Sequence, residues 1–181
     1  MKKAVLIIAV LVILSAAAAL SACGRESAEF DFSEAIRIHI RANGNGEEDQ
    51  AVKLKVRNEI ITLLTPALSE CASPAQAAAA IENKLLDIEN VAVNTLRKNG
   101  FDYGARASLK KEEFPERRYL GLTFEAGVYR ALIVELGEAK GENWWCVAFP
   151  PLCFVPEGEG EKITLKSKIL EIIEKYFKSD N

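Results

Sequence analysis

The sequence has little histidine and no excess of positive charge. His39 is the single histidine among 181 residues, and the formal net charge is −3. One histidine excludes most His-rich metal sites. A mild acidic excess argues against non-specific nucleic-acid binding, which needs clustered lysines and arginines against phosphates. No internal repeat is present. We therefore expect no nucleic-acid partner, no metal site and no cofactor.

The bulk composition is that of a globular chain rather than a disordered one. Hydrophobic residues make up 49% of the sequence and charged residues 27%. A chain of about 150 residues buries roughly two-thirds of the surface that its unfolded form exposes. The length therefore predicts one domain after an N-terminal leader, stable without a metal or a dense set of disulfides.

The N-terminal segment has the pattern of an export signal. Lys2 and Lys3 precede an uncharged run over residues 4–22, as in the charged and apolar regions of a signal peptide. Small residues before Cys23 resemble a lipobox, in which that cysteine is lipidated. The alternatives are an uncleaved membrane anchor, since the run is about long enough to span a bilayer, and ordinary cleavage. All three predict a domain outside the cytoplasm, and the first two keep it on the membrane through its N-terminus.

Residues 34–42 alternate between apolar and basic side chains. Three isoleucines alternate with Arg37, His39 and Arg41. A period of two with β-branched residues predicts a half-buried strand. The basic side would then be a solvated face, or a docking surface for an acidic partner or for anionic lipid.

Two segments that follow have the apolar spacing of helices. The first begins with acidic residues and is expected over 47–65, because a proline follows and disfavours helical geometry before it. The second begins with Ser73 as its N-cap and Pro74 at its first position. Asn99-Gly100 is a typical helix stop.

Beyond residue 100 the pattern changes to strands, at 103–109, 128–136 and 144–149, with weaker candidates near 114–115 and 118–124. A last amphipathic helix is expected over 164–177. Segregated runs of this kind favour an α+β fold. We predict a single domain with a mostly antiparallel sheet packed against a helical pair, plus a C-terminal helix. The predicted boundaries are 1–23 for the export signal or lipoprotein leader, 24–33 for a linker, 34–156 for the α+β domain, and 157–181 for a linker and the C-terminal helix.

Trp144 and Trp145 are adjacent on one predicted strand. Successive side chains of a strand point to opposite faces of its sheet. Either helices cover both sheet faces, or one tryptophan is exposed. An exposed tryptophan outside the cytoplasm would indicate a surface that binds a partner.

Cys146 and Cys153 flank a segment with two prolines that can turn the chain back. Outside the cytoplasm a disulfide between them is plausible, and the alternative is two buried thiols. Cys71 lies between the two predicted helices and is interpreted as a semi-buried thiol. A thiol enzyme would need His39 as the base, but two flanking arginines would lower its basicity. No ligand set of metal-site spacing is present.

Two blocks of the sequence resemble the stage II sporulation protein R family. The first covers Ile36–Asn43, with Glu47–Gln50 and Leu54–Arg57 after it. The second covers 143–154 and reads Asn-Trp-Trp-Cys-Val-Ala-Phe-Pro-Pro-Leu-Cys-Phe, a long run of rare residues. Between the blocks, further matches are Phe114-Pro115, Tyr119, Gly121, and Ala126-Gly127 with Tyr129.

The resemblance implies a signalling protein rather than an enzyme. Members are exported from the forespore into the space between forespore and mother-cell membranes. There they activate a membrane-embedded aspartic protease, which processes the precursor of an early mother-cell sigma factor. The residues expected to contact that receptor are Arg37, His39, Arg41, Asn143, Trp144 and Trp145. Two other classes remain open: a lipid-anchored envelope protein that binds a small ligand, and a thiol-dependent enzyme.

Overall fold

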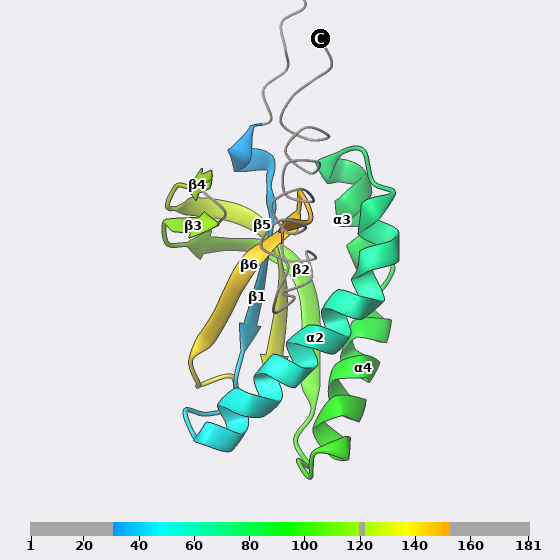
Figure 1. Cartoon of the computed structure of the whole chain (residues 1–181), viewed down its shortest axis with the longest axis vertical. Coiled ribbons are helices and arrows are strands. Elements are labelled where there is room, and N and C mark those ends of the chain that lie inside the picture. Colours follow the sequence, from blue (N-terminus) through cyan, green and yellow to red (C-terminus); the bar gives the residue numbers. More distant parts are fainter. Residues whose placement is uncertain (1–30, 120–121, 153–181) are drawn as a thin grey trace, which may run out of the picture.

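The computed structural model describes residues 31–119 and 122–152 (Figure 1). The predicted C-terminal helix and most of the predicted linker before residue 34 lie outside the described residues. In chain order the elements are η1 (Phe32–Glu34), β1 (Ile36–Arg41), α2 (Glu47–Ser69), α3 (Pro74–Glu82), α4 (Leu85–Lys98), β2 (Ala105–Phe114), β3 (Arg117–Tyr119), β4 (Leu122–Phe124), β5 (Gly127–Leu136) and β6 (Asn143–Phe149).

The main sheet has four strands in the order β2-β5-β1-β6. Strand β1 runs parallel to β5 and antiparallel to β6, and β2 runs antiparallel to β5. A separate two-stranded sheet pairs β3 with β4. The sheet is therefore mixed but mostly antiparallel, and the predicted α+β fold is confirmed.

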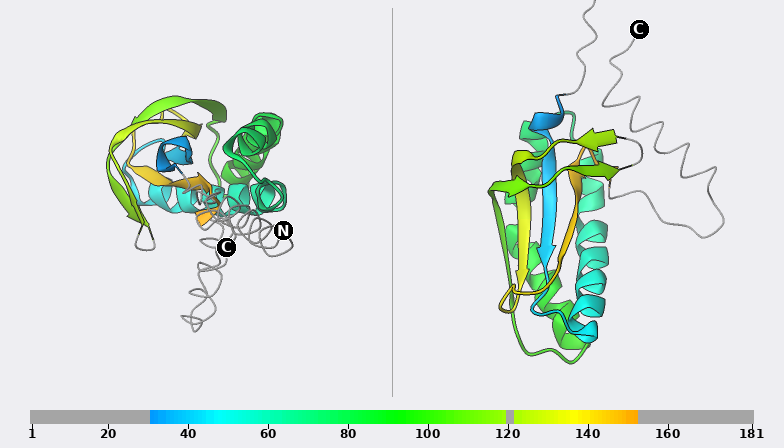
Figure 2. Two further views of the ribbon diagram at one scale, coloured as in Figure 1. Left: turned by 90° about the horizontal axis from the view of Figure 1, so that it is seen from above. Right: turned by 90° about the vertical axis from the view of Figure 1, so that its left-hand side faces the viewer.

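The helices lie on one face of the sheet (Figures 1 and 2). Isoleucines 36, 38 and 40 of β1 point to this face and join the main apolar core with buried residues of α2, α3 and α4. No helix within the described residues is long and apolar enough to cross a membrane. No α-helix among the described residues covers the opposite face, and we call it the open face.

Helix α2 is longer than the sequence predicts. The predicted end near Thr65 is wrong, because the helix continues through Pro66 to Ser69. Leu64 and Leu68, on either side of the proline, are both fully buried. Their burial in the core outweighs the hydrogen bond that the proline cannot donate.

The second predicted helix is divided in two. Ser73 caps α3 as predicted, and its Oγ accepts a hydrogen bond from the backbone N–H of Gln76 (3.3 Å). The helix is interrupted by a turn at Asn83 and Lys84 before α4 begins, so the layer formed by the described residues has three helices rather than a pair. Gly100 follows with a φ of +86°, which confirms the predicted stop.

The loop after β1 is fastened to the turn between β5 and β6. The Asn43 side-chain carbonyl accepts from the backbone N–H of Glu138 (2.9 Å), and that of Asn45 accepts from Glu142 (2.6 Å). The turn needs Gly137, which has a φ of +56° and no room for a Cβ beside Asn43. This contact fixes the ends of β1, β5 and β6 at one edge of the molecule.

Candidate functional site on the open face

The open face gathers the polar half of β1 with its neighbours. The side chains of Arg37, His39 and Arg41 point there, next to those of Asn143 and Trp145 on β6. In the right-hand view of Figure 2 no helix lies in front of this face, while η1 and the β3–β4 hairpin cross one end of it. The face is therefore closed at that end and open at the end where Arg41 lies.

The basic side of β1 is buried, contrary to the expectation of a solvated face. Arg37 is 0% exposed and His39 is 1% exposed. The strand lies between β5 and β6, and aromatic side chains cover its polar face, because four rings surround Arg37 and Trp145 stacks on His39. The prediction of a half-buried strand is wrong for this physical reason.

Arg37 lies inside a box of aromatic rings. Its guanidinium carbon is 4.6 Å from the ring centroid of Phe114 and 4.9 Å from that of Tyr129. The rings of Phe124 (5.3 Å) and Tyr119 (5.7 Å) complete the box. Negative ring faces attract a cation in this geometry. The rings therefore supply electrostatic compensation that a carboxylate usually gives.

The hydrogen bonds of Arg37 are few. Its Nε donates to the Cys146 carbonyl (3.3 Å) and its Nη2 to the Tyr119 hydroxyl (3.4 Å). Among the described residues, its Nη1 has no hydrogen-bond partner. Burial lowers the pKa of Arg37 from its usual value, although an arginine stays charged at physiological pH.

His39 lies next to Arg37 on the same face of β1. Its ring stacks on Trp145 with centroids 3.7 Å apart and planes at 21°. Its Nδ1–H donates to Glu112 Oε1 (2.6 Å), while Nε2 is buried with no hydrogen bond to the described residues. Burial lowers the pKa of His39, against the opposing influence of Asn143 and Glu112. The ring is therefore held neutral near pH 7.

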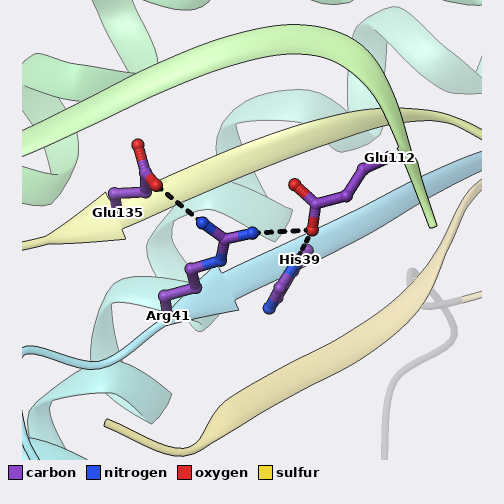
Figure 3. Close-up of polar contacts among 4 residues, drawn as sticks. All are labelled: His39, Arg41, Glu112 and Glu135. Carbon is purple, nitrogen blue, oxygen red and sulfur yellow. Dashed lines mark hydrogen bonds and ion pairs between the residues drawn. The ribbon is translucent and has the colours of Figure 1, made fainter. Parts of the chain in front are cut away.

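Arg41 links three strands through two carboxylates (Figure 3). Its Nη2 donates to Glu112 Oε1 and its Nη1 to Glu135 Oε1, each at 2.8 Å. Glu112 on β2 thus accepts from both Arg41 and His39 with one oxygen. The side chains of Arg41 and Glu112 are 27% and 16% exposed, so this network lies at the solvent boundary of the open face.

The two tryptophans lie on opposite faces, as predicted, but neither of the two expected arrangements holds. Within residues 31–119 and 122–152, helices cover only one face of the sheet, and yet neither tryptophan is fully exposed. Trp144 packs on the main core, with the Arg57 guanidinium 5.3 Å from its ring. Trp145 is half-buried because it stacks on His39 and meets the edge of Phe114 (4.8 Å).

The structure describes two of the cysteines for which we made predictions from the sequence, Cys146 and Cys71. Cys146 is disulfide-bonded, and its side chain lies on the helical face, away from His39. This arrangement contradicts the thiol-enzyme alternative, which needed the two side chains together. Cys153 and Cys23 lie outside the described residues, so their bonding and lipidation stay predictions. Cys71 is buried and donates to the Ala67 carbonyl (3.2 Å).

The structure thus brings together five of the six predicted contact residues and separates Trp144 from them. Sequence reasoning missed Glu112, Glu135 and the four rings around Arg37, because they come from strands whose register a single sequence does not give. The alternation in β2, which puts Glu112 and Phe114 on one face, was the available signal. Among the described residues, no group of three or more acidic, histidine or cysteine side chains is arranged to hold a metal ion.

Comparisons with known proteins agree with the two sequence blocks. A family model described as Stage II sporulation protein R (spore_II_R) matches residues 32–159. The chain is also 32% identical, over 170 residues, to a curated Bacillus subtilis (strain 168) protein with the name Stage II sporulation protein R. That match covers 90% of this chain and 76% of the relative. No solved structure matches the chain.

Proposed function

The chain belongs to the stage II sporulation protein R family, and from this premise we propose that it is an exported, non-enzymatic signal. Membership supports a role in sporulation. In the proposal, the forespore exports the chain into the intermembrane space. There it activates a membrane-embedded aspartic protease that processes the precursor of an early mother-cell sigma factor.

The family match is the observation that carries this proposal. It extends over the described domain from η1 to the end of β6 and includes both blocks of rare residues. The leader pattern at Lys2 and Lys3, with the apolar run after it, supports export. The site agrees with a binding role, because its polar side chains are used to hold one another rather than aimed at a substrate.

Activation would occur through binding. An aspartic protease needs two aspartates brought together, and a ligand shifts such an equilibrium by its differential affinity for the two states. We propose that the exposed end of the open face contacts the receptor, with Arg41, Asn143 and Trp145 at its surface. Arg37 and His39 would act from beneath, by fixing the position of Trp145 and the curvature of the sheet.

The test is complementation in a spore-forming host that lacks its own copy of the gene. The full chain should restore cleavage of the sigma-factor precursor, scored by immunoblot. Asn143→Glu should lower processing at least several-fold, since Asn143 is exposed at the proposed contact. The matched control is Asn58→Glu, which places the same change at an exposed site on helix α2.

Failure of the unaltered chain to restore cleavage, at normal protein level, would contradict the signalling function. Full cleavage with Asn143→Glu would show that the open face does not contact the receptor, and it would not contradict the signalling function. Turnover of a substrate by the purified chain would contradict the non-enzymatic role.

A further inference from the structure

Strand β2 forms one edge of the main sheet. It pairs with β5 along its whole length from Ala105 to Phe114 without a register shift. Its other side pairs with no strand in the described part of the chain. Edge strands present unpaired backbone groups, and proteins cover or charge them to prevent unwanted pairing.

Helix α4 covers the start of this edge. The Glu89 carboxylate accepts a hydrogen bond from the backbone N–H of Ala107 (2.8 Å). This contact establishes that the backbone of Ala107 points outward. In an antiparallel ladder the outward direction repeats at every second residue. The N–H and C=O groups of Leu109, Lys111 and Glu113 therefore also point outward, and no contact among the described residues covers them.

The uncovered part of the edge carries unbalanced positive charge. Lys110 and Lys111 are exposed on it, with Arg106 before them and Arg130 beside Lys111 on β5. None of the four forms an ion pair with the described residues, whereas Glu112 is already engaged by His39 and Arg41. Glu113 alone opposes them on this strand. A local excess of positive charge on a chain of net charge −3 selects an acidic partner.

We propose that the outer edge of β2, from Leu109 to Glu113, binds an extended acidic segment of the partner protein as an added strand. Backbone hydrogen bonds would give the affinity and the lysines the selectivity. This inference rests on the proposed function, because it supplies a second surface by which the chain would contact its receptor. The edge borders the open face, so an added strand would widen that face at Glu112.

A second copy of the chain is a poor occupant of the same edge. Antiparallel pairing of two copies about Lys111 would place that lysine opposite itself, which destabilises a strand pair. It would also place Lys110 opposite Glu112, whose carboxylate already accepts from His39 and Arg41. The carboxylates of an acidic strand would instead be attracted to these lysines. The lysines thus favour a partner of opposite charge over a second copy of the chain.

The binding test uses the full chain in non-ionic detergent and two capped peptides of alternating sequence, (Glu-Val)₄ and (Lys-Val)₄. Hydrogen exchange should be fast at the backbone amides of Leu109, Lys111 and Glu113 in the free protein. The glutamate peptide should slow exchange at these three positions, and the lysine peptide should not. Equal binding of both peptides, or protection elsewhere only, would overturn the proposal.

Two variants of one residue separate backbone pairing from charge. Lys111→Pro removes an outward N–H without touching the ladder to β5, a position where an edge strand tolerates proline. It should weaken binding of the glutamate peptide at least tenfold. Lys111→Thr removes only the charge and should weaken binding about two- to fivefold, the range of an exposed ion pair. Undiminished binding by the proline variant would contradict the added strand.

The complementation assay in the spore-forming host distinguishes a failure of this inference from a failure of the proposed function. Lys111→Pro, at normal protein level, should lower cleavage of the sigma-factor precursor, while Lys98→Thr at the exposed end of α4 should not. Full cleavage with the proline variant would reject the edge as a receptor contact, and the unaltered chain would still restore processing. Loss of processing by the unaltered chain would instead reject the function.

Discussion

Arg37 is fully buried and forms no ion pair with the described residues, so its charge rests on aromatic rings, one hydroxyl and one carbonyl. Removing a cation from water costs several kcal/mol, and this cost is not always repaid. The four rings recover part of it. The position therefore combines a costly charge with a tightly packed side chain.

These two contributions predict opposite effects for two substitutions at Arg37. Arg37→Met keeps most of the volume without the charge, and the free energy of unfolding should change by less than about 1 kcal/mol, or rise. Arg37→Ala should lower it by about 2–5 kcal/mol, because a cavity remains inside the ring box. Urea unfolding measures both. A loss of several kcal/mol with methionine would mean that the charge itself stabilises the fold.

His39 gives the domain a pH-dependent stability. Burial lowers its pKa in the folded state, although Glu112 and Asn143 oppose the shift. The unfolded chain therefore binds a proton first as the pH falls through about 6.5. The free energy of unfolding should be full above this pH and should decrease below it, by up to about 1.4 kcal/mol per pH unit.

The comparison is with His39→Asn, whose amide can still donate to Glu112 but does not titrate. Thermal unfolding from pH 7.5 to 5 should give a steeper decline for the unaltered chain than for the variant. Parallel curves would show that His39 binds its proton equally in both states. Because acidic residues titrate in both proteins, only the difference between the curves reports on His39.

At the scale of elements, Pro66 lies inside helix α2 and destabilises that helix locally. It is exposed on α2, and the helix continues past it because Leu64 and Leu68 are buried. Pro66→Ala should raise the free energy of unfolding by about 1–3 kcal/mol, since a helix-interior proline costs up to about 3 kcal/mol. Chemical denaturation measures the gain, and Thr62→Ala on the same exposed side of the helix serves as the control.

The positions of the strands could be predicted from the sequence, but which strands pair with each other could not. Alternation placed β1 correctly, because the side-chain period follows from strand geometry alone. A nearly continuous apolar run placed β5. Alternation did not reveal that β1 lies between β5 and β6, which depends on pairing across most of the chain. Nor did it reveal the aromatic rings that cover Arg37 and His39, so the basic side of β1 was expected in solvent. Arg41 alone fits that expectation in part, since it lies half-exposed at the strand end.

At the scale of the whole molecule, the edge strand β6 carries a disulfide-bonded cysteine, Cys146. We predict Cys153 as the partner. Non-reducing peptide mapping should find the two residues linked, and Cys71→Ala should leave that link intact. Reduction should lower the free energy of unfolding by roughly 2–3 kcal/mol, the loop-closure value for a short loop. A link from Cys146 to Cys23 would contradict the pairing and the lipidation prediction together.

The position of β1 in the sheet sets the order in which the domain can assemble. Of the six described strands this one comes first in the sequence, yet its hydrogen-bond partners, β5 and β6, come last. A polypeptide threaded N-terminus first through a translocation channel would expose β1 long before either partner emerged. Such pairing over long sequence separations forms slowly. The chain would therefore stay open enough to thread and would acquire its final shape only after β6 had reached the far side.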